Sequence, residues 1–351
     1  MRKRKGIKCN DNLLSSDFGT YIGDFEMNKT VLAILKVLDK RPDTILGSRE
    51  ISRQLKLHGV ELTERTVRYH LRILDERGFT KVFGKEGRMI TQKGKEELSQ
   101  ALVSEKVGFV ISKIETLSYL TNLDLEKNEG DIILNVSYFP EEKLKDALRI
   151  MKPVFSSPYI MSDKVVLHRS GEKVGDVFVP EGQVGFGTVC SVTINGIFLK
   201  AGIPVTSKFG GVLQIEESEP SRFTALISYE GSSLDPLEIF IKSGMTDVIG
   251  AVKNHSGKVL ASFREIPVVS IEKAKELNTL MKEKGIGGIL LIGNPNQPLL
   301  EMPVSMDKAG MVIVGGLNPI AALEEAGISA VSKAMSTLYR FSDLIKFKEL
   351  L

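Results

Sequence analysis

Leu62–Gly78 reads LTERTVRYHLRILDERG, and this segment decides how the first third of the chain is interpreted. Spacing of i, i+4 and i+7 places three apolar side chains on one face of a helix: Val67, Leu71 and Leu74. Three arginines share another face: Arg65, Arg68 and Arg72. Thr63 is suited to cap the start of this helix, and Gly78 is suited to end it. The segment therefore predicts a short amphipathic helix with a cationic outer face.

The residues around this segment predict the rest of a small helical unit. Residues 28–41 and 48–59 have the apolar period of two further helices, joined by a short turn. Residues 79–92 contain two β-like runs around the turn GKEG, and a charged helical segment follows. The hairpin carries three cationic side chains: Lys81, Lys85 and Arg88. This order predicts a winged helix-turn-helix over residues 28–104, with the hairpin as its wing.

Charge is distributed unevenly along the chain. Residues 1–106 contain 22 Lys and Arg against 15 Asp and Glu, whereas residues 107–351 contain 25 against 29. A basic first third on a mildly acidic remainder predicts a polyanion-binding head joined to a body of another kind. A solvated surface and a protein-docking surface are the alternatives for the basic face of Leu62–Gly78. The preceding helices and the basic wing favour DNA.

Cysteine content and hydropathy restrict the cellular setting. Cys9 and Cys190 are too few for a disulfide framework or a zinc site, so a reducing, cytoplasmic compartment is expected. No apolar run reaches the length of about 18 residues that a membrane span needs, so no membrane partner is expected. Residues 1–27 are polar and lack periodicity, which predicts a flexible N-terminal extension. A DNA-contacting arm and translation from Met27 are the alternatives for this extension.

From Val107 onward, long β-branched runs alternate with helical segments. Residues 108–120 and 130–139 are expected to be strands or strand-rich. Residues 140–152 are expected to form a helix with Pro140 near its first position. This alternation predicts an α/β body over residues 107–351, and hence an α+β chain overall.

Two stretches of the body are similar to each other in sequence. Asn195–Val205, NGIFLKAGIPV, resembles Asn318–Ala330, NPIAALEEAGISA. Each stretch follows a β-rich run, opens with an asparagine expected to be a helix N-cap, and reaches Ala-Gly-Ile after one short helix. We therefore predict two related half-units, about 107–235 and 236–345, with convergent strand-to-helix sequence as the alternative.

No catalytic or metal-binding motif is present in the sequence. The histidines lack the spacing of a zinc site: His58, His70, His168 and His255. For His70, inside the basic helix, phosphate contact and core packing are both open. The chain has no P-loop, and Gly185–Cys190 leads into a strand, unlike a dinucleotide-binding turn. We predict that the protein is not an enzyme and binds no metal or cofactor, and that Cys190 is buried and unreactive. The competing classes are a protein whose body is an enzyme and a protein-interaction adaptor.

Cationic residues of the body are the candidates for binding a small anion. Four lie near Gly-rich or strand-end positions: Lys200, Lys208, Arg222 and Arg264. An exposed solvating charge is the default for each, but as a set they could pair with a dicarboxylate. Asn195 stands at an expected helix start, where backbone N–H groups favour an anion, although a plain N-cap is the simpler interpretation.

Two long stretches carry a resemblance to a known family. Residues 47–80, GSREISRQLKLHGVELTERTVRYHLRILDERGFT, with GKEGRMIT after them, resemble the winged-helix head of the NrpR family, the nitrogen-regulatory repressors of methanogenic archaea. Residues 187–215, GTVCSVTINGIFLKAGIPVTSKFGGVLQI, and residues 233–241, SLDPLEIFI, resemble its effector domain. The resemblance runs from about Met27 to the C-terminus, with both domains in order.

The resemblance implies a repressor of nitrogen-assimilation genes. Such a protein binds a palindromic operator in double-stranded DNA as a homodimer or higher oligomer, and releases it when 2-oxoglutarate accumulates. The body then becomes an effector-binding and oligomerisation domain. Family members carry one or two effector domains, and this chain has room for one, which leaves a role for a separate subunit carrying another. A winged-helix regulator that senses a different metabolite is the alternative.

The resemblance, together with the helical spacing, assigns candidate contacts. The expected DNA-binding residues lie at the start of the second helix, on the third helix and on the wing: Ser48, Arg49, Thr63, Arg65, Thr66, Arg68, Tyr69, Arg72, Lys85 and Arg88. A dianionic effector needs a cation and N–H donors, and the residues expected to supply them are Asn195, Lys200 and Arg264.

Overall fold

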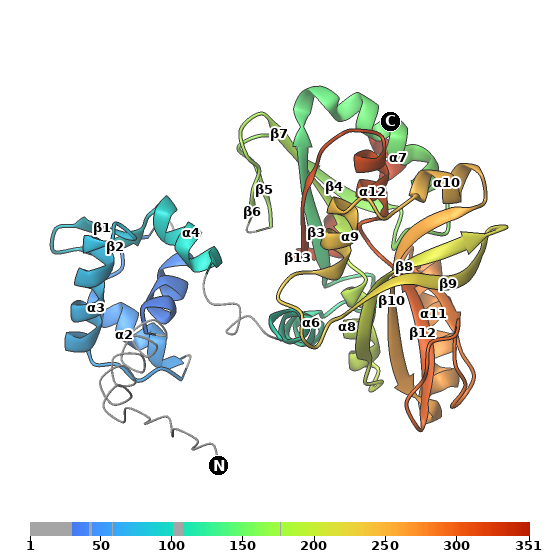
Figure 1. Ribbon diagram of the computed structural model, residues 1–351, viewed down its shortest axis with the longest axis horizontal. Coiled ribbons are helices and arrows are strands. Elements are labelled where there is room, and N and C mark those ends of the chain that lie inside the picture. Colours follow the sequence, from blue (N-terminus) through green and yellow to red (C-terminus); the bar gives the residue numbers. More distant parts are fainter. Residues whose placement is uncertain (1–29, 42–43, 58, 101–107, 176) are drawn as a thin grey trace, which may run out of the picture. The chain divides into compact units, whose positions relative to one another are not determined.

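The computed structural model describes residues 30–41, 44–57, 59–100, 108–175 and 177–351. Their contacts fall into two compact units, Met1–Glu105 and Lys106–Leu351 (Figure 1). The extension predicted for residues 1–27 lies outside the described residues.

The first unit is a winged helix, as predicted. Its elements in chain order are a helix over residues 30–39, α2 (Ser48–Leu57), α3 (Glu64–Glu76), β1 (Thr80–Phe83), β2 (Gly87–Ile90) and α4 (Gln92–Gln100). A two-bond bridge between Leu46 and Arg88, with N···O distances of 3.0 Å each way, ties the wing to the chain before α2. Gly87 makes this approach feasible, because its φ is +143° and a Cβ there would lie 2.3 Å from the Leu46 carbonyl oxygen.

The predicted apolar stripe of α3 is the core of the winged unit. Val67, Leu71 and Leu74 are fully buried. They pack with Ile51 and Leu55 of α2 and with residues of the first helix. Thr63 caps α3 by accepting a hydrogen bond from the Thr66 N–H at 3.2 Å, and Gly78, with φ +73°, follows the helix end. Burial of this stripe fixes which face of α3 remains outside.

The second unit contains two five-stranded antiparallel sheets. Their strand orders are β11-β12-β10-β8-β9 and β13-β3-β7-β4-β14. The strands are β3 (Asp131–Pro140), β4 (Lys164–His168), β7 (Gln183–Val189), β8 (Thr206–Glu216), β9 (Glu219–Ser228), β10 (Gly257–Pro267), β11 (Ile289–Ile292), β12 (Lys308–Val314), β13 (Val331–Arg340) and β14 (Ile345–Lys346). A small ribbon is formed by β5 (Lys173–Val174) and β6 (Val177–Phe178).

Helices cover these sheets (Figure 1). They are α6 (Phe109–Leu120), α7 (Leu144–Phe155), α8 (Val192–Lys200), α9 (Pro236–Lys242), α10 (Val248–Lys253), α11 (Ile271–Glu283) and α12 (Asn318–Glu325). Short 3-10 turns precede α7 and α11 at Glu141–Lys143 and Val268–Ser270, and two more lie at Phe341–Asp343 and Phe347–Leu350. The combination of a winged helix and this mixed unit confirms the predicted α+β architecture.

One order of elements occurs twice in the second unit. Strand, 3-10 turn, helix, strand, strand, helix and strand follow one another from β10 to β13, and the same order runs from β3 to β8 once the small β5–β6 ribbon between β4 and β7 is set aside. Each half contributes its last strand to the sheet of the other, because β8 pairs with β10 and β13 pairs with β3. The two halves therefore interlock, and neither has a complete sheet of its own.

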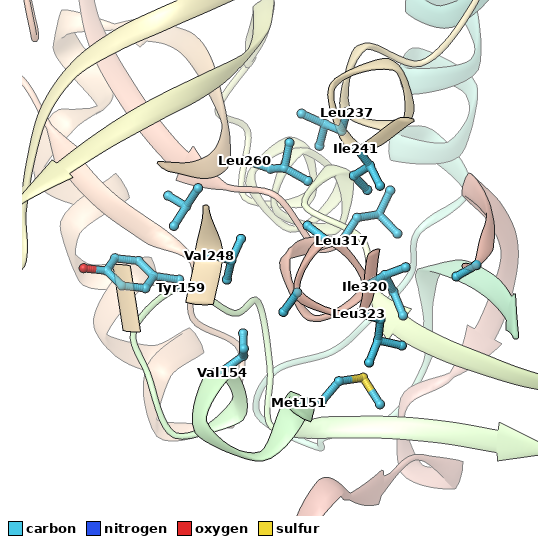
Figure 2. Packing of buried hydrophobic residues seen from close by; sticks show 14 of the residues in the cluster. Met151, Val154, Tyr159, Leu237, Ile241, Val248, Leu260, Leu317, Ile320 and Leu323 are labelled. Carbon is cyan, nitrogen blue, oxygen red and sulfur yellow. The ribbon is translucent and has the colours of Figure 1, made fainter. Parts of the chain in front are cut away.

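A large apolar cluster surrounds α12. Figure 2 shows Leu317, Ile320 and Leu323 of this region beside labelled side chains from α7, α9 and α10. All three side chains are fully buried. Helices from both halves meet in this cluster, so apolar packing joins the halves in addition to the exchanged strands.

Two expectations about local structure were wrong. Residues 108–120, expected to be strand-rich, form α6, because Val110, Ile114 and Ser118 recur at i, i+4 and i+8 and are buried. Tertiary packing outweighs their β-branched propensity. Gly196 of α8 allows close contact with α6, since a Cβ there would lie 2.9 Å from the Ser118 carbonyl oxygen. Pro140 ends β3, and the following helix begins only at Leu144.

The predicted equivalence of Asn195 and Asn318 was also wrong. Helix α8 begins at Val192, so Asn195 lies inside it and is not an N-cap. Asn318 begins α12, but its side-chain amide bonds to β10: its Oδ1 accepts from Leu260 N–H at 2.8 Å. Thr193 does the same in the first half, where its Oγ1 accepts from Ile133 N–H at 3.1 Å. Thr193 is therefore the counterpart of Asn318.

Candidate nucleic-acid interface and effector pocket

The outer face of α3 presents the predicted basic residues together. Arg65, Arg68, Tyr69 and Arg72 are all exposed, and 60% of the surface of Tyr69 is accessible. Thr63 and Thr66 lie at the start of the same helix, with their hydroxyl groups 2.8 Å apart. The helix N-terminus adds unpaired N–H groups and a partial positive charge. This face can bind a polyanion and, through its planar side chains, can also contact base edges.

Glu64 joins the start of α2 to the basic face of α3. Its Oε1 accepts from the Ser48 hydroxyl at 3.1 Å, and its carboxylate lies 3.8 Å from both Arg49 and Arg68. Both arginine side chains remain exposed, at 91% and 62%. Exposed pairs of this kind contribute little to stability, so the guanidinium groups are free to exchange the carboxylate for phosphate.

Of the two wing residues that are predicted to contact DNA, Lys85 is exposed and Arg88 is only partly accessible. Lys85 is exposed at the tip of the hairpin. Arg88 is engaged instead with Asp75 of α3, at 2.8 Å, with both side chains largely buried. Asp75 also accepts from the Thr80 hydroxyl at 2.6 Å. Arg88 therefore braces the hairpin against α3, and its contact with DNA stays a prediction.

His70 faces the core. Only 9% of its surface is exposed, and its ring packs edge-on against Tyr69 with centroids 5.2 Å apart. Nδ1 has no hydrogen-bond partner among the described residues. Of the two roles that the sequence left open, packing is the one observed.

The buried imidazole predicts a pH dependence of stability. Burial lowers the pKa of His70, so the unfolded chain takes up this proton at a higher pH than the folded chain. We expect the free energy of unfolding to hold its full value above about pH 6.5, the ordinary histidine pKa, and to fall at lower pH. Thermal unfolding of the full chain between pH 7.5 and 5 measures this. His70→Leu should flatten the dependence; an identical slope in both proteins would contradict it.

The second unit contains a pocket of about 680 Å³ between α6, α8 and the start of β8. Asn195, Ser207 and Lys208 contribute polar groups to its lining, and Glu115 and Glu230 contribute carboxylates. The face of α6 that carries Ile111, Ile114 and Ser118 covers the pocket; Figure 1 shows α6 beside α8. Such a volume suits a small metabolite.

Arg264 lies beneath this pocket and is the largest fully buried side chain of the described residues. Its guanidinium donates to the Ser191 carbonyl at 2.9 Å, to the Ser191 hydroxyl at 2.8 Å and to Asn195 Oδ1. Asn195 in turn donates from Nδ2 to Ser207 Oγ at 3.0 Å. Burial lowers the pKa of Arg264. The partners of this guanidinium among the described residues are thus a carbonyl, a hydroxyl and an amide oxygen, and no ion pair within 4.0 Å joins it to a carboxylate there.

The cation that lines the pocket is Lys208 rather than the predicted Lys200. The pairing of β8 with β10 skips Lys208, because Ser207 faces Arg264 and Phe209 faces Phe263. Its Nζ lies 3.7 Å from Glu265. The strand-end position marked Lys208 as a candidate in the sequence, but a bulge cannot be located without the partner strand.

Two of the three predicted effector residues are therefore in contact, and one is elsewhere. Asn195 and Arg264 share a hydrogen bond. Lys200 lies at the end of α8, with its Nζ 6.0 Å from the Tyr119 ring centroid, and does not line the pocket. Arg222 is exposed on β9, also outside the pocket. Cys190 is buried, and burial raises the pKa of its thiol to about 11.

The parts of the chain that the structure describes contain neither a metal cluster nor a membrane span. These residues contain no cluster of three or more His, Cys, Asp or Glu side chains able to hold a metal ion. None of their helices has both the length and the apolar character needed to cross a bilayer.

Comparisons with known proteins match both units. Residues 107–346 match the family model "NrpR regulatory domains NRD1 and 2", and residues 32–98 match the winged-helix domain of ribonuclease R. The chain is 37% identical to the global nitrogen regulator NrpRI of Methanosarcina mazei, over 92% of this chain and 98% of that protein. It is 34% identical to NrpR of Methanococcus maripaludis, over 89% of this chain and 54% of that protein.

A solved structure is also similar. The crystal structure of a nitrogen repressor-like protein from Methanococcus jannaschii matches with a TM-score of 0.58 and 32% sequence identity. The match covers 68% of this chain and 98% of that chain.

Proposed function

Because the chain belongs to the NrpR family of nitrogen regulators, we propose that it represses nitrogen-assimilation genes from a palindromic operator and is released by 2-oxoglutarate. It is a DNA-binding transcriptional regulator and not an enzyme, as its relatives and its winged helix indicate. The buried Arg264, bonded to Asn195 of the pocket lining, is the observation that carries the effector part of this proposal.

The operator would be read by α3. Its exposed arginines and Tyr69 would enter the major groove, Ser48 and Arg49 would contact the backbone, and Lys85 would take the wing to a flanking phosphate. A homodimer would place two such helices on the two half-sites of a palindrome, one helical turn apart or a multiple of it.

The effector would enter the pocket next to α6. 2-Oxoglutarate is a dianion, and the pocket offers it Lys208, the hydroxyl of Ser207 and the field of Arg264. No metal or other cofactor is part of the proposal. Helix α6 is the first helix after residue 107, so it is the element of the second unit that stands nearest in sequence to the winged unit. A ligand that packs against α6 would change the position of this helix. Release requires the ligand to bind the non-binding state more tightly; equal affinity for both states would shift nothing.

Two substitutions on the winged unit should separate base reading from phosphate contact. Arg68→Ala should weaken operator binding by about 1–3 kcal/mol and reduce the preference for the operator over random DNA. Lys85→Ala should weaken binding to both DNAs alike and lower the slope of log K against log salt by about 1. Fluorescence anisotropy on both DNAs, over a range of salt, measures these effects. An equal loss on both DNAs for Arg68→Ala would refute its reading role.

The test of the whole proposal is an operator gel shift with and without 2-oxoglutarate. Release at rising 2-oxoglutarate, but not at rising concentrations of a neutral analogue such as its diester, is the expected result. Binding that is insensitive to salt would favour a protein-interaction adaptor, because phosphate contacts release counterions. Release by another metabolite alone would favour the alternative sensor.

A further inference from the structure

The two halves of the second unit end their second helix in the same way. Gly202 N–H donates to Leu199 O at 2.9 Å after α8, and Gly327 N–H donates to Glu324 O at 3.0 Å after α12. Both glycines have left-handed backbones, with φ of +80° and +82°. The chain then enters β8 and β13 at the same distance from each glycine. Leu199 is therefore the counterpart of Glu324, and Val205 is the counterpart of Ala330.

In the second half, a carboxylate of the chain itself fills the space between helix and strand. Glu324 Oε1 accepts from Ala330 N–H at 2.8 Å and from Lys242 Nζ at 2.5 Å. Lys242 comes from the end of α9 and also donates to the Ala330 carbonyl at 2.6 Å. This corner therefore binds one carboxylate through a backbone N–H and an ammonium group.

In the first half, the corresponding corner is open. Leu199 replaces the glutamate, and 43% of its surface is exposed. Leu199 and Val205 both line the 680 Å³ pocket. Val205 N–H has no hydrogen-bond acceptor among the residues that the structure describes. The pocket also holds a cation, Lys208, three residues further along β8.

From this repeat we propose that a carboxylate of the effector occupies the place that Glu324 fills in the second half, and accepts a hydrogen bond from Val205 N–H. The inference rests on the proposed function of the pocket and extends it to a named atom. It assigns one effector molecule to each chain, because the chain's own carboxylate already occupies the second copy of the corner. Lys208 is the lysine in the lining of this pocket and would take the part that Lys242 plays for Glu324.

Leu199→Glu tests the proposal by supplying an internal carboxylate where the effector's carboxylate would bind. Leu199 is half exposed, so the fold should accept the change, and Leu199→Met is a control of similar size without an acceptor. Calorimetry of the full chain with 2-oxoglutarate should give one site per chain in the control, and an affinity about tenfold or more lower in Leu199→Glu. Unchanged affinity in Leu199→Glu would overturn the proposal.

A second measurement does not depend on the identity of the effector. In a chain labelled with ¹⁵N-valine, the Val205 amide resonance, assigned through Val205→Ile, should move downfield and exchange more slowly in Leu199→Glu than in Leu199→Met. An unmoved resonance would overturn the proposal. If the control binds glutarate or citrate at Val205 but not 2-oxoglutarate, the proposed effector fails and this inference stands. If 2-oxoglutarate binds and leaves the Val205 resonance in place, this inference fails and the proposed function stands.

Discussion

Replacing Arg264 by leucine should remove the response of operator binding to 2-oxoglutarate while leaving operator affinity unchanged. Arg264 supplies the buried positive charge beneath the pocket and holds Asn195 Oδ1 and the Ser191 carbonyl. A single hydrogen bond to a charged group contributes about 1.5–3 kcal/mol, and the loss of one such interaction with the effector corresponds to a loss of about 10- to 150-fold in effector affinity. The winged unit is a separate compact unit, so its affinity for DNA should persist.

The measurement is a pair of titrations on the full chain, with 2-oxoglutarate by calorimetry and with operator DNA by anisotropy. Arg222→Leu is the matched control, because Arg222 is an exposed arginine on β9 outside the pocket. Thermal unfolding of both variants shows whether the second unit remains folded. Wild-type effector affinity in a folded Arg264→Leu protein would refute the role of this charge.

Replacing Leu71 by alanine should strongly destabilise the winged unit and lower the fraction of the protein that can bind the operator. Leu71 of α3 is fully buried in a core shared with α2 and the first helix, so its truncation leaves a cavity in this small core. Such substitutions cost about 2–5 kcal/mol, against about 5–15 kcal/mol of total stability in a typical domain. Binding of 2-oxoglutarate should survive, because Lys106–Leu351 has its own core.

Calorimetric unfolding of the full chain is the measurement for this variant. Arg72→Ala alters an exposed side chain of the same helix, and should change the free energy of unfolding by less than about 0.5 kcal/mol. Loss of effector binding along with operator binding in Leu71→Ala would show that the two units depend on each other.

The winged unit could be predicted from the sequence because its signals are local. The stripe of Leu71 and its neighbours, the Thr63 cap and the Gly78 stop all lie within one segment, and each is observed. Arg88 is the exception there. Its partner Asp75 lies 13 residues away across the hairpin, and a sequence pattern does not show that contact.

In the second unit, several features could not be predicted from the sequence pattern. Its β-branched residues 108–120 resembled a strand, but their spacing let α8 bury one face of a helix. Asn195 looked like a helix cap, yet it bonds to Arg264, 69 residues further along the chain. Exchange of β8 and β13 between the halves brings such residues together, and no local rule encodes an exchange of strands.

Sequence alone determined the winged helix, the basic face of α3 and the resemblance that led to the family. These depend on helical periodicity, on caps and on residue identity, which are properties of neighbouring positions. Tertiary structure alone decided that Arg264 is buried against Asn195, that Lys208 rather than Lys200 lines the pocket, and that Leu199 stands where the other half has Glu324. These three facts depend on the pairing and register of strands that are distant in the sequence. Strand pairing determines which side chains become neighbours and which are buried away from water.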